Sequence, residues 1–433
     1  MIESRLNEAH GPTSKDLIQV TTEDFMKIIY NLDCIRAPMT GVAYYTQNMV
    51  LAMIRSYSDQ KIGPELEISS FRHNKLLSKQ ETLDLCSHFT AAPKKNSPRK
   101  TWLTAKLIES INRFAFARSL IQWQKSMRHR LTLKHSIDGA IYHEPNFVFL
   151  PHNGPKVLTV HDISMFSCPE FLPKGRAKFL QKHMRRGMQE ADALIVSCQF
   201  IKDEIMQLLK IPESKIYIAS PGAQENFKPR PEDEVKTSLE KFSLSYKQFL
   251  LCVATLEPRK NLLRLIKAYQ TLPDEIQKKF PLVLVGNKGW LYEELLKLIN
   301  EPQHPNVVLL RYVDEQVLFH LYSAAKAFIY PSLYEGFGLP VLEAMQSGLP
   351  VISSNVSSLP EVCGNAGILV DPLDVSAMTA AMQQLLTADA QTYADYVKHS
   401  IAQAKKFSWN NFAEQLFEAY KPINLKSDTH KSL

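Results

Sequence analysis

The sequence PSLYEGFGLPVLEAM, residues 331–345, decides the fold. The apolar residues 327–330 immediately before it predict a buried strand. Gly336 and Gly338 permit close approach of the backbone, and Pro340 suits the first turn of a helix, where its missing N–H costs nothing. The next glycine along the chain is expected to end that helix. Free N–H groups at the helix start, at the positive end of the helix dipole, predict an anion site suited to a diphosphate.

Two glutamates in this stretch, Glu335 and Glu343, are expected to have different roles. Glu335 precedes the glycines at the carboxyl end of a strand, where ligands bind in open α/β sheets. Glu343 lies about one turn into the helix. A carboxylate beside a diphosphate is unfavourable unless it accepts hydrogen bonds from hydroxyls, so each glutamate is expected to face one sugar of a nucleotide-sugar. The alternative is that both are solvated surface charges, as acidic residues usually are.

The rest of the chain alternates strands with helical stretches, which predicts an α/β fold with parallel sheets. The expected strands are 27–32, 157–160, 193–197 and 216–219, and then 248–254, 282–285, 307–310, 327–330 and 351–353. Two such series predict two Rossmann-like domains facing a central cleft. The expected boundaries are a flexible extension over 1–23, a first domain over 24–221, a linker over 222–246, a second domain over 247–408, and a helix over 409–421 that packs back on the first domain.

Composition excludes several classes of protein. The chain has 433 residues and 45% hydrophobic content, enough for two domains with substantial cores. Its six cysteines are scattered without a C-x-x-C pair, which favours buried thiols in a reducing compartment over a disulfide framework. The first residues are polar and lack the apolar core of a signal peptide. No run approaches the roughly 18 apolar residues of a membrane span, so a cytoplasmic protein is expected.

Positive charge is concentrated in residues 92–135, which carry eleven Lys and Arg against one acid, Glu109, although the whole chain has a net charge of only +7. Trp102 and Trp123 lie among these cations in a helical-looking stretch. A basic helix with interleaved aromatics predicts contact with an anionic membrane surface. The alternative is a helix whose aromatics face the domain core while its cations are solvated. No RNA or DNA motif accompanies the segment, so no nucleic acid partner is expected.

The strings YEGFGLPVLEAMQSGLPV and SSLPEVCGNAGILVDPLD resemble the E-x7-E signature of retaining family 4 (group 1) glycosyltransferases of the GT-B fold. The resemblance extends from about Met26 to about Tyr420. In that family the first glutamate binds the transferred sugar and the second binds the nucleotide ribose, so the resemblance gives these roles to Glu335 and Glu343. It also implies a donor-binding loop formed by Gly336, Phe337, Gly338 and Leu339.

A second loop, Thr255-Leu256-Glu257-Pro258-Arg259-Lys260-Asn261, follows a predicted strand and opens a helix. Cations beside a departing diphosphate stabilise the transition state more than the ground state, because negative charge gathers there as the bond breaks. The resemblance assigns this task to Arg259 and Lys260. Many relatives have Gly-Arg where this chain has Ala254-Thr255, which weakens the assignment of Arg259. The alternative, two surface charges, is disfavoured because cations at a helix start oppose the dipole.

The first half of the chain supplies two more candidates. His161 follows a predicted strand, and a lone histidine is as often structural as functional. It resembles the family's cleft histidine, which contacts the donor sugar. Gly41 resembles the family's glycine loop and would let the backbone approach phosphate or acceptor. That loop is not a G-x-G-x-x-G fingerprint, which weakens a dehydrogenase interpretation. Gly286-Asn287-Lys288-Gly289-Trp290 is either a wall for the nucleotide base or an ordinary turn.

The resemblance implies retention by front-face attack without a covalent nucleophile, and no metal or other cofactor, since no D-x-D pair lies near the cleft strands. Two other classes compete. A glycoside hydrolase needs two carboxylates about 5–9.5 Å apart, whereas eight residues of helix would separate Glu335 and Glu343 by ~12 Å. A non-catalytic nucleotide-binding subunit shares the same residues and is harder to exclude.

The donor and acceptor are expectations from the resemblance alone. TVHDISMFSCPEFLP, EPRKN and SLYEGFGLPVLEAM look most like bacterial mannosyltransferases of surface polysaccharide synthesis, which favours GDP-mannose as donor. UDP-sugars and dTDP-rhamnose remain alternatives. The expected acceptor is a saccharide, lipid-linked at the cytoplasmic face of the membrane, which would make the enzyme a peripheral protein of that face.

Overall fold

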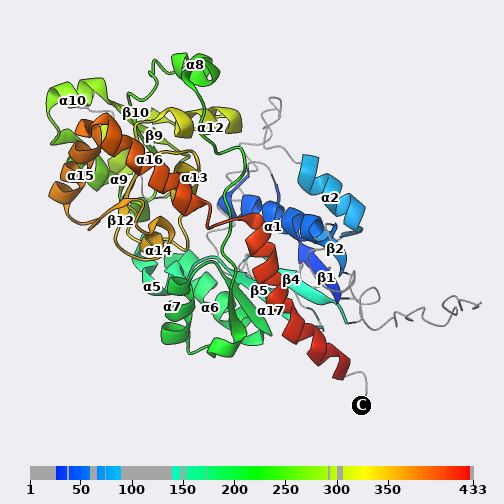
Figure 1. The fold of residues 1–433 in the computed structure, drawn as a ribbon. Coiled ribbons are helices and arrows are strands. Elements are labelled where there is room, and N and C mark those ends of the chain that lie inside the picture. Colours follow the sequence, from blue (N-terminus) through cyan, green and yellow to red (C-terminus); the bar gives the residue numbers. More distant parts are fainter. Residues whose placement is uncertain are drawn as a thin grey trace, which may run out of the picture.

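The computed structural model consists of two α/β domains, each built on its own sheet (Figure 1). It describes residues 26–36, 39–58, 66–73, 75–88, 139–146, 149, 152, 154–172, 174–290, 293–299 and 306–429. Two expectations, the extension over 1–23 and the basic segment 92–135, lie outside these residues. No helix in the described ranges combines the length and apolar character needed to cross a membrane.

The first sheet has seven strands in the order β3-β2-β1-β4-β5-β6-β7. Its strands are β1 Met26–Asn31, β2 Leu66–Arg72, β3 Lys75–Leu77, β4 Ile141–Glu144, β5 Lys156–Val160, β6 Ala193–Val196 and β7 Ile216–Ile218. All neighbours pair in parallel except β2 and β3, which form an antiparallel hairpin at the edge. The helices of this domain are α1 Gly41–Ser58, α2 Lys79–His88, α5 Ser164–Ser167, α6 Lys174–Glu190 and α7 Gln199–Leu209.

Alternation along the strands divides the first sheet between two layers of helices. Val157 and Ile195 belong to the core that includes α1, whereas Leu158 and Leu194 belong to the core that includes α6 and α7. Successive side chains of a strand point to opposite faces, so β5 and β6 are buried on both sides. This is why these strands consist mainly of apolar residues.

The second sheet has six parallel strands in the order β10-β9-β8-β11-β12-β13. Its strands are β8 Leu250–Val253, β9 Leu282–Val285, β10 Val307–Leu310, β11 Ala327–Tyr330, β12 Val351–Ser354 and β13 Ile368–Val370. Its helices are α9 Leu262–Gln270, α10 Asp274–Lys279, α11 Glu293–Ile299, α12 Glu315–Ala324, α13 Leu339–Gln346, α14 Leu359–Cys363, α15 Val375–Thr387 and α16 Ala390–Ala404. The expectation of an α/β fold with two Rossmann-like domains is confirmed.

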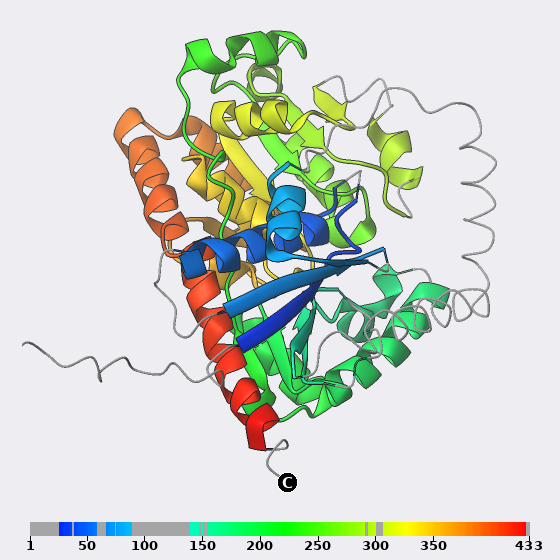
Figure 2. The same ribbon diagram turned by 90° about the vertical axis from the view of Figure 1, so that its right-hand side faces the viewer.

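Two helices lie outside this alternation. α8, Glu232–Glu240, forms within residues 222–246 and packs on α12. α17, Trp409–Thr429, leaves the second domain and packs against α1 of the first, where Phe412, Leu416 and Tyr420 are fully buried (Figure 2). The chain therefore crosses between the domains twice.

Candidate functional site

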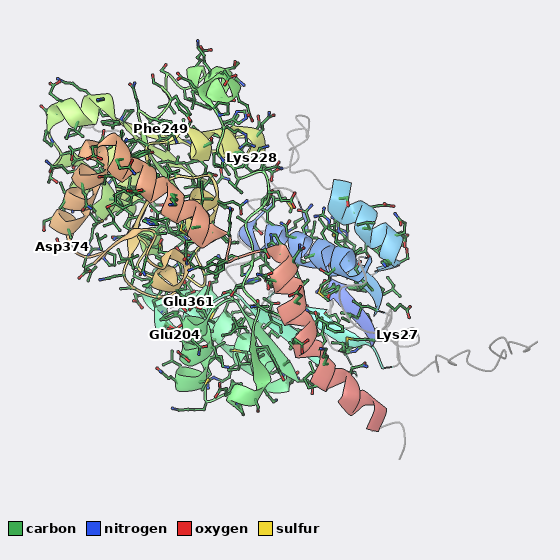
Figure 3. The ribbon with its side chains drawn as sticks, viewed as in Figure 1. Lys27, Glu204, Lys228, Phe249, Glu361 and Asp374 are labelled. Carbon is green, nitrogen blue, oxygen red and sulfur yellow. The ribbon has the colours of Figure 1, made fainter. Side chains whose placement is uncertain are left out.

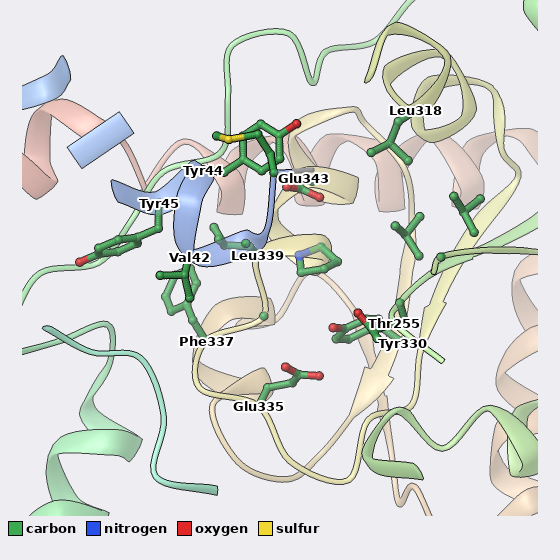
Figure 4. A pocket seen from close by; sticks show the side chains of 18 of the residues that line it. Val42, Tyr44, Tyr45, Thr255, Leu318, Tyr330, Glu335, Phe337, Leu339 and Glu343 are labelled. Carbon is green, nitrogen blue, oxygen red and sulfur yellow. The ribbon is translucent and has the colours of Figure 1, made fainter. Parts of the chain in front are cut away.

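A cleft of about 510 Å³ lies between the two domains (Figure 4). The first domain contributes the start of α1 and the turn after β5, and the second contributes the loops after β8 and β11. The cleft residues include every site residue predicted from the sequence: Gly41, His161, Arg259, Lys260, Glu335, Gly336, Phe337, Gly338, Leu339 and Glu343. The structure thus brings together residues that are up to three hundred positions apart in the chain, and their individual roles stay predictions.

The loop after β11 has the predicted shape. Gly338 precedes α13 with a φ of 108°, which favours glycine, and Pro340 occupies the first turn. Gly348, with a φ of 69°, follows the end of α13. α13 begins at Leu339, so Glu335 lies in the loop and Glu343 in the helix, as predicted. The separation of ~12 Å, calculated for eight residues of continuous helix, therefore does not apply to this pair.

Gly336 is required by the approach of the two domains. A Cβ at this position would lie 2.0 Å from the carbonyl oxygen of His161 in the first domain. The Gly336 carbonyl in turn accepts a hydrogen bond of 2.9 Å from the Ser197 hydroxyl. The predicted close backbone approach is therefore present, and its partner is the other domain.

Glu335 is held by two cations from the loop after β8. Lys260 Nζ donates to Glu335 Oε1 at 2.5 Å, and Arg259 Nη1 donates to Glu335 Oε2 at 3.0 Å. Glu335 and Lys260 are only 7% and 8% exposed. Burial favours the neutral acid, but the charges of Arg259 and Lys260 outweigh it and lower the pKa of Glu335 to about 2. Glu335 is therefore an ionised carboxylate at neutral pH.

Further partners fix the two cations. Lys260 also donates to the Tyr330 hydroxyl at 2.7 Å, and Arg259 Nη2 lies 2.8 Å from Glu257 Oε1. The local charges of Arg259 and Lys260 balance those of Glu257 and Glu335. A charge removed from such a buried set leaves its partner uncompensated. Glu257 was not predicted as a site residue, although it lies in the same quoted loop.

Glu343 is in a different electrostatic environment. The Tyr322 hydroxyl donates to Glu343 Oε2 at 3.0 Å. Burial raises the pKa of Glu343 to about 7, the Tyr322 hydrogen bond opposes this, and nearby Glu315 adds to it. Glu315 also lies near Tyr44 of the first domain and adds to the raised pKa of the Tyr44 hydroxyl, which is raised mainly by burial. Figure 4 shows Glu335 and Glu343 in separate parts of the cleft, with Tyr44 beside Glu343.

His161 lies at the first-domain side of the cleft, directly after β5. Its Nε2 donates to the carbonyl of Pro145 at 2.8 Å, and its ring meets Tyr45 edge-on at 4.7 Å. Burial lowers the pKa of His161, so the ring is neutral at pH 7. The proton on Nε2 is fixed because a carbonyl can only accept.

Direct hydrogen bonds join the two domains beside the cleft. The Tyr334 hydroxyl donates to Glu204 Oε2 at 2.6 Å, and Glu361 Oε1 accepts the backbone N–H of Gln199, at the start of α7, at 3.0 Å. Figure 3 shows Glu204 and Glu361 at this junction. Such long-range pairs leave no local signal in the sequence.

The residues of the segment 286–290 have two different structural roles. A Cβ at Gly286 would lie 1.9 Å from the Ala254 carbonyl oxygen, so strand packing alone requires this glycine. Gly286 and Asn287 line the cleft, whereas the Trp290 indole donates to the carbonyl of Phe171 at the domain junction. Within the described ranges, no group of three or more His, Cys, Asp or Glu is placed to hold a metal ion.

Comparison with known proteins assigns both halves of the chain to glycosyltransferase families. The model "Glycosyl transferases group 1" matches residues 236–406, and the model "Glycosyltransferase Family 4" matches residues 84–226. The chain is 34% identical over 400 residues to O-antigen chain mannosyltransferase B of Escherichia coli, which covers 92% of this chain and 100% of that protein. It is 33% identical over 237 residues to a serotype-specific mannosyltransferase WbdA of Escherichia coli, covering 54% of this chain and 29% of WbdA.

Solved structures agree on the fold. Sucrose-phosphate synthase from Thermosynechococcus elongatus matches with a TM-score of 0.64 at 19% identity, covering 92% of this chain and 99% of that one. WaaG, a glycosyltransferase involved in lipopolysaccharide biosynthesis, matches with a TM-score of 0.62 at 16% identity, covering 91% and 98%. The fold is GT-B, and the chain is a glycosyltransferase that belongs to family 4, with a group 1 domain as its second half.

Proposed function

We propose that this glycosyltransferase transfers mannose from GDP-mannose to a saccharide acceptor, with retention of configuration, during the synthesis of a surface polysaccharide. The observation that most supports the proposal is that Arg259 and Lys260 both bind the carboxylate of Glu335. These residues line the same cleft as His161 of the other domain. The two mannosyltransferase relatives support mannose as the sugar, and O-antigen chain mannosyltransferase B supports a surface polysaccharide as the product.

In this proposal the parts of the donor are divided along the loop after β11. The ionised carboxylate of Glu335 accepts hydrogen bonds from hydroxyls of the transferred sugar, and Glu343 accepts them from the ribose. The diphosphate lies between them at the N-terminus of α13, where free N–H groups and the helix dipole favour an anion. His161 contacts the sugar from the first domain, so the sugar is held between the domains.

Arg259 and Lys260 supply the electrostatic part of the reaction. Negative charge grows on the diphosphate as the glycosidic bond breaks, and two fixed cations nearby stabilise that charge without reorganisation. We expect the acceptor hydroxyl to attack from the face that the diphosphate leaves, with a phosphate oxygen taking the hydroxyl proton. No covalent nucleophile and no divalent metal are needed in this scheme.

The acceptor is proposed to be a lipid-linked saccharide at the inner face of the cytoplasmic membrane, with the enzyme bound there as a peripheral protein. The basic segment 92–135 supports this through its charge alone. In the described part of the first domain, α6 adds a second basic surface, because Lys178, Lys182 and Arg185 are exposed on one face of the helix while Met184 and Met188 are buried on the other.

A single-turnover assay with labelled sugar nucleotides tests the proposal. The purified full chain is incubated with GDP-mannose, UDP-glucose or dTDP-rhamnose and a membrane extract that contains lipid-linked acceptors. Transfer from GDP-mannose alone supports the proposal, and transfer from another donor corrects the sugar and the base. Nucleotide binding without transfer of any sugar would favour a non-catalytic subunit.

A further inference from the structure

The last residue of β4, Glu144, is a buried carboxyl group with three hydrogen-bond donors around it. It is 2% exposed. Its Oε2 accepts from Asn31 Nδ2 at 2.7 Å and from the Tyr142 hydroxyl at 2.8 Å. Its Oε1 accepts the backbone N–H of Asn146 at 3.2 Å. Glu144 therefore ties the end of β1 to the turn that follows β4.

That turn also carries the acceptor for His161. The carbonyl of Pro145 receives the Nε2 proton of His161 at 2.8 Å. This carbonyl and the N–H of Asn146 belong to the same peptide group, which is planar. Glu144 holds the N–H side of the plane, and His161 is bound to its carbonyl side. Because the Pro145 ring fixes φ, the remaining freedom of this peptide group is rotation about ψ, which the Glu144 hydrogen bond opposes.

We propose that Glu144 is a positioning residue that sets the ring orientation and tautomer of His161 through the Pro145–Asn146 peptide group. The effect on catalysis rests on the proposed function, in which His161 contacts the donor sugar. The effect on the His161 ring itself does not depend on that function.

The chemistry of Glu144 suits a fixed support. Burial raises the pKa of Glu144 to about 8, and the hydrogen bonds from Asn31, Tyr142 and Asn146 oppose this only in part. The group is therefore mostly a neutral acid at pH 7. A glutamine can keep the hydrogen bond from Asn146 by placing its amide oxygen there, with its NH2 group directed at the Tyr142 hydroxyl oxygen. An alanine cannot, since it leaves buried donors of Asn31 and Asn146 without an acceptor.

The opposite side of β4 provides a matched control. His143 Nδ1 lies 2.5 Å from the Tyr420 hydroxyl of α17, and His143 Nε2 lies 2.8 Å from Thr159 Oγ1. Tyr420 is fully buried, and its hydroxyl hydrogen-bonds to His143 and to Tyr30. Tyr420→Phe removes a buried hydrogen bond while keeping the Pro145–Asn146 peptide group in place.

Steady-state kinetics of the full chain test the proposal. The variants compared with the wild type are Glu144→Ala, Glu144→Gln, His161→Ala, the double alanine variant and Tyr420→Phe. We expect Glu144→Ala to lower kcat by roughly 10- to 100-fold, as small misplacements of a positioning group do. The affinity for free GDP should stay the same, because His161 contacts only the sugar. Glu144→Gln and Tyr420→Phe should stay near the wild-type rate. The double variant should be no slower than His161→Ala, because Glu144 acts through His161.

Long-range 15N–1H NMR of the histidine rings gives a readout that needs no activity. The wild type should show His161 with its proton on Nε2, Glu144→Gln should keep this pattern, and Glu144→Ala should mix the tautomers. An unchanged His161 spectrum in a folded Glu144→Ala variant, or rate losses that simply multiply in the double variant, would overturn the proposal. If the wild type transfers no sugar from any donor, the proposed function fails, and the spectrum still decides the role of Glu144.

Discussion

The ammonium group of Lys260 lies 2.5 Å from the carboxylate of Glu335, although the two residues are 75 positions apart in the chain. In the proposed function, this contact joins the carboxylate that binds the sugar to a cation that binds the diphosphate. Each charge offsets the cost of burying the other. If the diphosphate binds as proposed, it competes with Glu335 for Lys260, and we expect this contact to couple the sugar site to the leaving-group site.

We expect Lys260→Ala to lower the transfer rate on the order of 10² or more, comparable to the loss of one preorganised donor in other active sites. The lost charge matters most when the diphosphate leaves, so kcat should fall more than the affinity for GDP-mannose. Rapid-quench kinetics measure both quantities. Lys267→Ala removes an exposed lysine from α9 and serves as the control, with an expected rate close to wild type.

Arg259 and Lys260 take the place of a divalent cation in this scheme. EDTA or added Mg²⁺ should therefore change the wild-type rate little, and the same should hold for Lys267→Ala. Initial rates at saturating GDP-mannose, with and without chelator, make the comparison. A rate that depends strictly on a divalent metal would show that the leaving group is stabilised in another way.

Substitutions of Glu335 and of Glu343 should have different effects on turnover and on GDP binding. Glu335→Gln removes the charge that faces the sugar, so turnover should fall while free GDP binds nearly as before. Glu343→Ala should weaken both, because the ribose belongs to GDP as well as to GDP-mannose. Calorimetric titration with GDP and a transfer assay distinguish the two results. Full activity in both variants would contradict the assignment.

The raised pKa of Glu343 predicts that donor affinity depends on pH. Since the pKa of Glu343 is raised to about 7, the group loses its proton as the pH rises through neutrality, and the ionised form is the better acceptor for ribose hydroxyls. The affinity for GDP-mannose, whose phosphates do not titrate in this range, should therefore increase from pH 6 to pH 8. Glu343→Gln should make the affinity independent of pH. A wild-type affinity that falls as the pH rises would contradict the assignment.

The strands that the sequence predicted best are β9, β10 and β11 of the second sheet. Residues 282–285, 307–310 and 327–330 form strands with the predicted ends, because each is a short apolar run between polar loops. β4 was missed. Its sequence IYHE carries a histidine and a glutamate, which are buried here only because Tyr420, Thr159 and Asn31 supply hydrogen bonds from distant parts of the chain.

The site was predictable to the level of loops but not of contacts. Parallel sheets bring the carboxyl ends of their strands to one edge, so residues after β8 and β11 were expected to meet. The ion pairs of Glu335 with Arg259 and Lys260, and the approach of Gly336 to His161, depend on the packing of one sheet and one domain on another. No local pattern encodes these distances.

Gly336 should be intolerant of any side chain. A methyl group at this position would lie 2.0 Å from the His161 carbonyl oxygen, which is backbone and cannot turn aside. Gly336→Ala should therefore abolish transfer by holding the domains apart, while the second domain still binds GDP. Gly175→Ala is the control, since nothing lies within 4 Å of its added Cβ at the exposed start of α6. Small-angle scattering should show a more open particle for Gly336→Ala only.

The proposed membrane contact predicts salt-sensitive binding to anionic vesicles. Each cation near an anionic surface contributes about 1 kcal/mol of attraction, and residues 92–135 carry ten net positive charges. Binding to vesicles that contain phosphatidylglycerol should weaken as salt shortens the Debye length. Vesicles of phosphatidylcholine alone should not bind. Co-sedimentation over a range of salt concentrations measures both effects.

Three sets of charge reversals locate the contact. The first set replaces four cations of the basic segment by Glu: Lys94, Lys95, Arg99 and Lys100. This variant should dissociate from anionic vesicles but still hydrolyse the donor, because the donor cleft lies elsewhere. Reversal of the exposed α6 cations Lys178, Lys182 and Arg185 should weaken binding further if that surface also faces the lipid. The third set reverses four exposed lysines, Lys236 and Lys241 of the segment 222–246 and Lys278 and Lys279 of α10. It changes the net charge by as much as the first set and should leave binding in place apart from a small general effect. Equal loss in the first and third sets would mean that net charge alone governs binding. If the wild type never sediments with anionic vesicles, the basic segment is a solvated surface, and a soluble saccharide becomes the better candidate for the acceptor.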